Sequence, residues 1–141
     1  LVHPILDADF PAAPEWLNEG IASLFEYPVV PRKGEIHGAT NWRLPRLTRA
    51  IRSQSERSEA TLSRLFQLDD SQFRGASEDL YYALARYFCQ WLDGRGQLWA
   101  FYRLWRDQHA KDPSGITSFR QVTGKAPGDF DRDFQRWALS L

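Results

Sequence analysis

The chain lacks several features that would narrow its function at once. Its 141 residues contain no methionine and one cysteine, Cys89, so no disulfide can form within the chain. No apolar run approaches the ~20 residues that cross a bilayer, and no signal peptide is visible. Because Cys89 lies among aromatic and aliphatic neighbours, we expect a buried thiol that packs as a small hydrophobic group.

An excess of charge of one sign is also missing. The chain has 18 basic and 18 acidic residues, which gives a formal net charge of zero. Such a chain has no overall field to attract nucleic acid or an anionic membrane, so neither is expected as a partner. The regularly spaced Arg43, Arg46, Arg49 and Arg52 would wrap round half of a helix, and we expect a solvated face there.

Aromatic residues are abundant, with six tryptophans and nine phenylalanines, and hydrophobic residues make up 43% of the chain. This composition supports a folded core and argues against disorder. At this length, one domain over residues 1–141 is expected. No internal repeat, low-complexity tract or clear linker divides the chain.

The spacing of apolar residues is helical almost throughout, and strand signals are nearly absent. Helices are expected at 1–6, 14–26, 41–51, 58–68, 77–92, from 98 to before Pro113, 117–122 and 129–139, with loops at 7–13 and 27–40. The segment 80–92 is apolar on nearly every face, which places it in the middle of a bundle. The sequence therefore predicts an all-α fold, an irregular multi-helix bundle.

Two polar residues, His3 and Glu19, lie in a sequence pattern that points to metal chemistry. His3 ends the segment Leu1-Val2-His3, and Glu19 lies in Trp16-Leu17-Asn18-Glu19-Gly20. The 16 positions between them allow for a helix end, a loop and a turn of the next helix. Catalytic zinc takes three protein ligands and keeps one position open. Gly20 would leave room for a closely packed neighbouring helix.

These segments resemble the second half of the zinc site in gluzincin metallopeptidases of the peptidase MA-like family. In that family H-E-x-x-H lies on one helix, and a Glu on the next helix is the third ligand. Residues 1–3 fit the final x-x-H, and residues 16–20 match the setting of the third ligand. The resemblance implies zinc as cofactor, His3 and Glu19 as ligands, and a peptide or protein substrate. Asn18 and Ser23 are either supporting groups of the metal site or ordinary exposed helix residues.

The same resemblance implies that this chain is the C-terminal helical subdomain of a zincin-like metallopeptidase. Residues 1–26 would hold the end of the zinc-binding helix and the third-ligand helix, and residues 41–141 a helical bundle. The first His and the catalytic Glu would lie upstream, as the absence of an initial methionine suggests. We therefore expect the missing N-terminal half of the same protein as a partner, and little zinc binding or activity in this chain alone.

Further expectations follow from the resemblance. Related aminopeptidases use a Tyr well downstream of the ligand Glu to stabilise the oxyanion, and Tyr81, ahead of Tyr82, falls in that range. Both tyrosines would otherwise pack in the core. Parents of this kind are often exported or membrane-tethered. A truncated surface also favours self-association.

The alternative is a non-catalytic helical interaction module. An exposed aromatic groove would then bind a peptide or a partner domain. Its expected residues are Trp99, Phe101, Tyr102 and Trp105. His37 and His109 have no ligand-spaced companions and are expected at the surface, and Asp7 and Asp9 are expected in an acidic loop.

Overall fold

The computed structural model describes residues 2–26 and 28–141. Leu1, the first residue of the metal-site pattern, and Tyr27, the first residue of the expected 27–40 loop, lie outside the described residues. The elements follow in the order α1 (Val2–Asp9), α2 (Glu15–Leu24), β1 (Pro28–Val29), β2 (His37–Gly38), α3 (Leu44–Arg52), the 3-10 helix η1 (Arg57–Glu59), α4 (Leu62–Gln67), α5 (Asp70–Phe73), α6 (Glu78–Gly94), α7 (Leu98–Gln108), α8 (Ile116–Thr123), the 3-10 helix η2 (Pro127–Phe130) and α9 (Asp131–Leu139).

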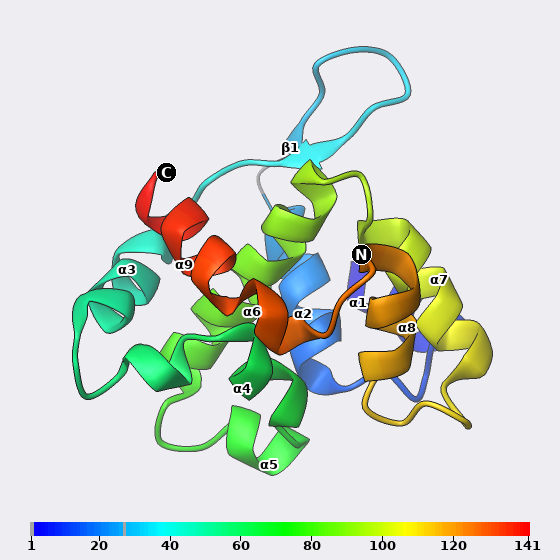
Figure 1. Ribbon diagram of the computed structural model, residues 1–141. Coiled ribbons are helices and arrows are strands. Elements are labelled where there is room, and N and C mark those ends of the chain that lie inside the picture. The colour runs from blue at the N-terminus through cyan, green and yellow to red at the C-terminus, as the bar shows by residue number, and fades with distance from the viewer. Residues whose placement is uncertain (1, 27) are drawn as a thin grey trace.

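The predicted all-α fold is confirmed, and α6 lies at its centre (Figure 1). This helix buries residues on nearly all of its faces, including Leu84, Phe88 and Leu92. Helix α2 makes the most extensive contact with it, and α3, α4, α5, α7 and α9 also pack against it. The burial of α6 on all sides explains its nearly continuous apolar sequence. Among the described residues, no helix has the length and apolar character that a bilayer crossing requires.

A small hairpin interrupts the helical order where only a loop was expected. Strands β1 and β2 pair antiparallel, with Val29 opposite His37, and the connecting loop projects from the helical body (Figure 1). A Cβ atom on Gly38 would collide with the side chain and the carbonyl oxygen of Leu24, so only glycine lets this strand approach α2 so closely. Two-residue strands are too short to show an alternating pattern in the sequence.

Helix boundaries differ from the expected ones at several places, and the single helix expected at 58–68 is divided into η1 and α4. Helix α1 continues to Asp9 instead of ending near residue 6, because Asp7 and Asp9 bond to side chains of other helices. Those bonds offset the cost of acidic groups at the negative end of a helix. The short helix α5 was not expected, and a capping box between Asp69 and Gln72 starts it.

Gly20 occupies the closest approach of α2 to α6, as the sequence suggested. A Cβ atom there would lie 2.7 Å from the carbonyl oxygen of Ala85 and 2.9 Å from Sγ of Cys89. We expect Gly20→Ala to lower the free energy of unfolding by ~1–3 kcal/mol, since both neighbours are buried and must shift. Urea denaturation measures the change.

The matched control for this substitution is Gly94→Ala. Gly94 is also helical, but a Cβ atom there meets no heavy atom within 4 Å. We expect this variant to match the wild type or to gain up to ~1 kcal/mol through helix propensity. Equal stability of the two alanine variants would contradict the close α2–α6 contact.

Candidate metal site

The two residues of the sequence pattern lie side by side where α1 meets α2. The connection between the helices is short, and Pro14 precedes α2 in an extended conformation with φ −65° and ψ 154°. Leu6 and Phe10 on one side and Trp16 and Ile21 on the other are buried in the common core. This packing directs the opposite edge of the helix pair, with His3 and Glu19, toward the surface.

A chain of hydrogen bonds fixes the His3 ring. Asn18 donates from Nδ2 to Oδ1 of Asp7 at 2.7 Å, so its own Oδ1 faces Nδ1 of His3, also at 2.7 Å. An amide oxygen accepts but does not donate, and therefore Nδ1 of His3 carries the proton. The neutral ring then has its lone pair on Nε2, which is the atom that faces Glu19. A supported histidine of this kind is typical of metal ligands.

The spacing of the two side chains suits a shared cation. Nε2 of His3 and Oε2 of Glu19 lie 3.4 Å apart, which is longer than a usual N–H···O hydrogen bond. Two ligands bound tetrahedrally to zinc at ~2.0–2.1 Å each lie ~3.3–3.4 Å from one another. The protonated form of His3 would instead make an ion pair with Glu19 at this distance. The geometry thus holds either a metal ion or a proton between the two groups.

The surrounding hollow has a volume of about 270 Å³ and is strongly polar. Besides His3, Asn18 and Glu19 it is lined by Asp7, Glu15 and Arg74. Arg74, which follows α5, forms an ion pair with Glu15 and so leaves Glu19 to His3. The hollow is open enough to admit solvent, because the His3 side chain is 45% exposed.

Helix α1 is tied to the bundle at its other end. Tyr102 of α7 donates a hydrogen bond to Asp9 at 2.9 Å, and Nη1 of Arg106 lies 2.9 Å from the same carboxyl oxygen. The hydrogen bonds from Arg106 and then from Tyr102 lower the pKa of Asp9, because both stabilise the charged carboxylate. This attachment fixes the direction of the helix that carries His3.

The described residues supply two donors and not a full ligand set. Within residues 2–26 and 28–141, no group of three or more His, Cys, Asp and Glu side chains is arranged to hold a metal ion. The donor chemistry of His3 and Glu19 fits zinc, which binds imidazole nitrogen and carboxylate oxygen. A third protein ligand would have to come from elsewhere in the protein.

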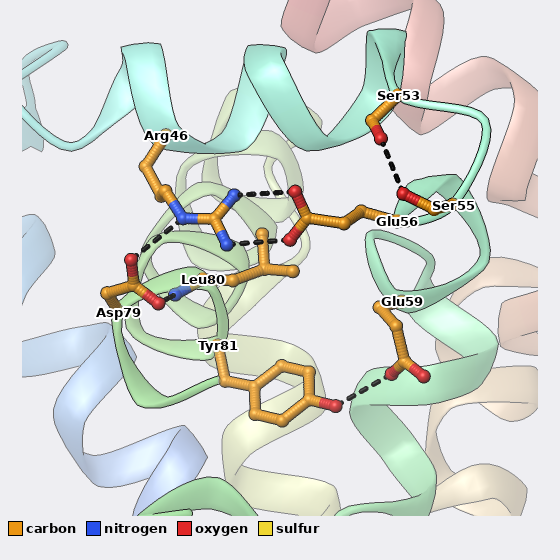
Figure 2. A network of polar contacts seen from close by, with 8 residues as sticks. All are labelled: Arg46, Ser53, Ser55, Glu56, Glu59, Asp79, Leu80 and Tyr81. Atoms are coloured by element: carbon orange, nitrogen blue, oxygen red, sulfur yellow. Dashed lines mark hydrogen bonds and ion pairs between the residues drawn. The ribbon is translucent and has the colours of Figure 1, made fainter. Parts of the chain in front are cut away.

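The two tyrosines of the sequence analysis point in different directions. Tyr81 donates a hydrogen bond to Glu59 at 2.7 Å (Figure 2). It also accepts one from Arg64 at 3.3 Å, and neither partner lines the hollow. Tyr82 lies against Phe73, and burial and then the charge of Glu19 raise the pKa of its hydroxyl. The contacts of Tyr81 with η1 and α4 were not visible in the sequence, and the role of either tyrosine stays a prediction.

Neither Ser23 nor the aromatic residues of α7 lie at an accessible site, apart from Trp99. Ser23 is buried one turn beyond Glu19, and its hydroxyl makes no hydrogen bond to any described residue. The groove does not form, since Phe101, Tyr102 and Trp105 are buried in the core and only Trp99 reaches the surface. Helix α7 turns its aromatic face inward against the core, while Trp99, Ala100 and Arg103 are exposed on its other side.

Sequence reasoning missed several polar contacts near these sites. Asp7 lies one helical turn after His3 on α1, and this spacing signals its role only if the helix is extended past residue 6. His37 was expected as a lone surface residue, but its Nδ1 lies 2.9 Å from Asp93 at the end of α6. The hydrogen bond to Asp93 raises the pKa of His37. Partners this distant in the chain leave no local pattern.

Comparison with known proteins assigns the chain to a family and finds no individual matching protein. No curated protein and no solved structure matches the chain. The sequence model of the family described as "Protein of unknown function (DUF1570)" matches residues 6–115. This stretch contains Asn18 and Glu19 and begins just after His3. Because the match covers well over half of the 141 residues, the chain belongs to this family.

Proposed function

We propose that this chain is the C-terminal helical part of a gluzincin-like zinc peptidase that hydrolyses peptide bonds. The observation that carries the proposal is the pair of His3 Nε2 and Glu19 Oε2 at 3.4 Å, with the ring oriented by Asn18. A charged pair at a surface needs no such support from a third and a fourth side chain. A ligand pair does, because the lone pair of the imidazole must be held in one direction.

Each residue of the chain has a defined task in this proposal. His3 and Glu19 hold the metal, and Asn18 and Asp7 keep Nδ1 of His3 protonated. When bound, zinc supplies Lewis-acid activation of water and of the scissile carbonyl. The remaining ligand and the general base would come from the upstream H-E of the motif. The chain by itself is then inactive.

Tyr82 is the residue of this chain that we assign to the substrate. A tyrosine hydroxyl is protonated at neutral pH, and the burial that raises the pKa of Tyr82 reinforces this state, so the hydroxyl can act as a hydrogen-bond donor. A donor aimed at the oxygen on which negative charge develops stabilises the transition state. Tyr81 lacks this freedom because Glu59 and Arg64 already engage its hydroxyl.

A helical interaction module remains the rival function, and one surface feature favours it. An apolar hollow of about 450 Å³ lies between α1, α2 and α7, where Ile5 is 65% exposed and Trp99 stacks on Phe25. Exposed apolar surface of this kind often marks a contact with another protein or domain. The residues just upstream of Leu1 separate the two functions, since a His-Glu pair there favours the peptidase.

Metal removal tests the proposal on the longer protein. We expect about one zinc per molecule by elemental analysis, loss of peptidase activity after treatment with a chelator, and recovery when one equivalent of zinc is returned. The 141-residue chain, with two ligands, should bind zinc far more weakly in calorimetry. A longer protein that carries no zinc and cleaves no peptide would leave the interaction module as the better explanation.

A further inference from the structure

Arg43 carries a positive charge that the fold does not neutralise. Its Cζ lies 4.4 Å from the ring centre of Trp42 and 5.0 Å from that of Tyr82, so two aromatic rings hold the guanidinium. Within the described parts of the chain no carboxylate forms an ion pair with Arg43, and its buried Nε has no hydrogen-bond partner. Stacking on rings orients a cation and leaves its N–H groups free to donate.

Two arginines near Arg43 do form ion pairs with acids. Arg46, on the next turn, is bound by Glu56 at 2.7 Å and by Asp79 at 2.8 Å (Figure 2). Arg74 is bound by Glu15. The supply of acids on this face therefore does not explain the unpaired state of Arg43. Asp79 lines the same hollow as Arg43 but is bound to Arg46, so Arg43 stays available to an outside anion.

The backbone that presents Arg43 is held in place before any ligand binds. The N–H of Arg43 donates to Oδ1 of Asn41 at 3.0 Å. Asn41 is fixed to α6, because its own N–H donates to the Tyr87 hydroxyl at 2.9 Å and that hydroxyl donates to the Asn41 carbonyl at 3.1 Å. A group that is already positioned loses little conformational entropy on binding.

Arg43 and Tyr82 line a hollow of about 560 Å³ next to the candidate metal site. Arg74 lines the metal site, and the two residues that follow it, Gly75 and Ala76, line this hollow. Two acids also border it. Asp79 is bound to Arg46, whereas Glu78 is exposed at the rim. Arg43 is thus a fixed cation in the hollow, and Glu78 is a solvated anion at its rim.

We infer that Arg43 binds a carboxylate of the peptide substrate in the hollow beside Tyr82. The inference rests on the proposed peptidase function only in naming a peptide as the ligand. A guanidinium presents paired N–H groups that match the two oxygens of a carboxylate. The carboxylate is either an acidic side chain or a free C-terminus, and both present the same chemistry to Arg43.

Direct binding to this chain tests the inference without any need for catalysis. The probes are acetyl-Ala-Ala-Glu-Ala-Ala amide, its Gln counterpart, and acetylated pentaalanine with either a free or an amidated C-terminus. Nitrogen–proton NMR of arginine side chains detects weak binding at Arg43 itself. We expect one of the two carboxylate probes to bind ~10-fold more tightly than its neutral counterpart, as a charge-assisted hydrogen bond implies.

Three variants make the test specific. Arg43→Gln should abolish the preference for the carboxylate, Arg43→Lys should retain part of it, and Glu78→Gln should strengthen it by removing a repelling charge. Far-ultraviolet circular dichroism checks that each variant is folded. Equal binding of charged and neutral probes by the wild type, or an unchanged preference in Arg43→Gln, would overturn the inference.

The same probes separate this inference from the proposed function. If the longer protein cleaves no peptide but the chain still prefers the carboxylate through Arg43, the peptidase proposal fails and the Arg43 site stands. If the longer protein cleaves the charged and neutral probes with equal kcat/KM, the peptidase proposal stands and the Arg43 site fails.

Discussion

Glu19→Gln in the longer protein should remove bound zinc and lower peptidase activity more than ~100-fold. Supporting residues around a metal already contribute 10–100-fold to affinity or activity, and a direct ligand contributes at least as much. The amide of Gln keeps the shape of the side chain but removes the negative charge that faces Nε2 of His3 at 3.4 Å. Elemental analysis and peptide hydrolysis measure the two effects on the same sample.

Glu15→Gln is the matched control for this substitution. Glu15 lies one helical turn earlier on α2 and lines the same hollow, but its partner is Arg74. We expect the control to keep its zinc. The zinc affinity of Asn18→Leu should lie between those of Glu19→Gln and Glu15→Gln. We expect a 10–100-fold loss, since the substitution frees the His3 ring to rotate. Full zinc binding by Glu19→Gln would remove Glu19 as a ligand.

Trp16→Ala should lower the stability of the bundle more than any substitution at the surface. The Trp16 side chain is 1% exposed and lies against Phe66, Phe88 and Trp105, at ring distances of 5.1, 5.7 and 5.8 Å. Loss of so large a buried side chain costs ~3–5 kcal/mol, which lowers Tm by roughly 10 to 20 °C. Thermal unfolding followed by circular dichroism measures the shift. Because Trp16 anchors the helix that carries Glu19, zinc binding should weaken as well.

Trp42→Ala is the matched control, because it removes the same side chain from an exposed position. Trp42 is 68% exposed and its main contact is with Arg43. We expect a loss of less than ~1 kcal/mol. A similar drop in Tm for the two tryptophan variants would show that α2 is not held by its aromatic contacts.

The sequence predicted the parts of the fold whose pattern is local. The segment 77–92 was expected as a central helix from its all-round apolar character, and α6 spans Glu78–Gly94. The β1–β2 hairpin was not predicted, because it depends on the approach of Gly38 to Leu24, which are distant in the sequence pattern. The end of α1 was placed too early for the same reason, since Tyr102 and Arg106 hold Asp9 from another helix.

The sequence likewise predicted only part of the candidate site. The pairing of His3 with Glu19 followed from a motif and a spacing, and the two side chains do meet. The bond from Asn18 to Asp7 depends on how α1 and α2 pack. The choice of Tyr82 over Tyr81 and the unpaired charge of Arg43 depend on what η1 and α6 place around them. These contacts form only when helices distant in the sequence pack against each other, so no local sequence pattern predicts them.

The thiol of Cys89 is buried where α2 packs against α6. Cys89 is fully buried, a Cβ at Gly20 would lie 2.9 Å from its sulfur, and burial raises the pKa of the thiol far above its usual value. A maleimide or disulfide reagent can react only when α2 lifts from α6. The labelling rate of the unmodified protein therefore reports how often the helix that carries Glu19 detaches, and zinc that joins His3 to Glu19 should slow that reaction.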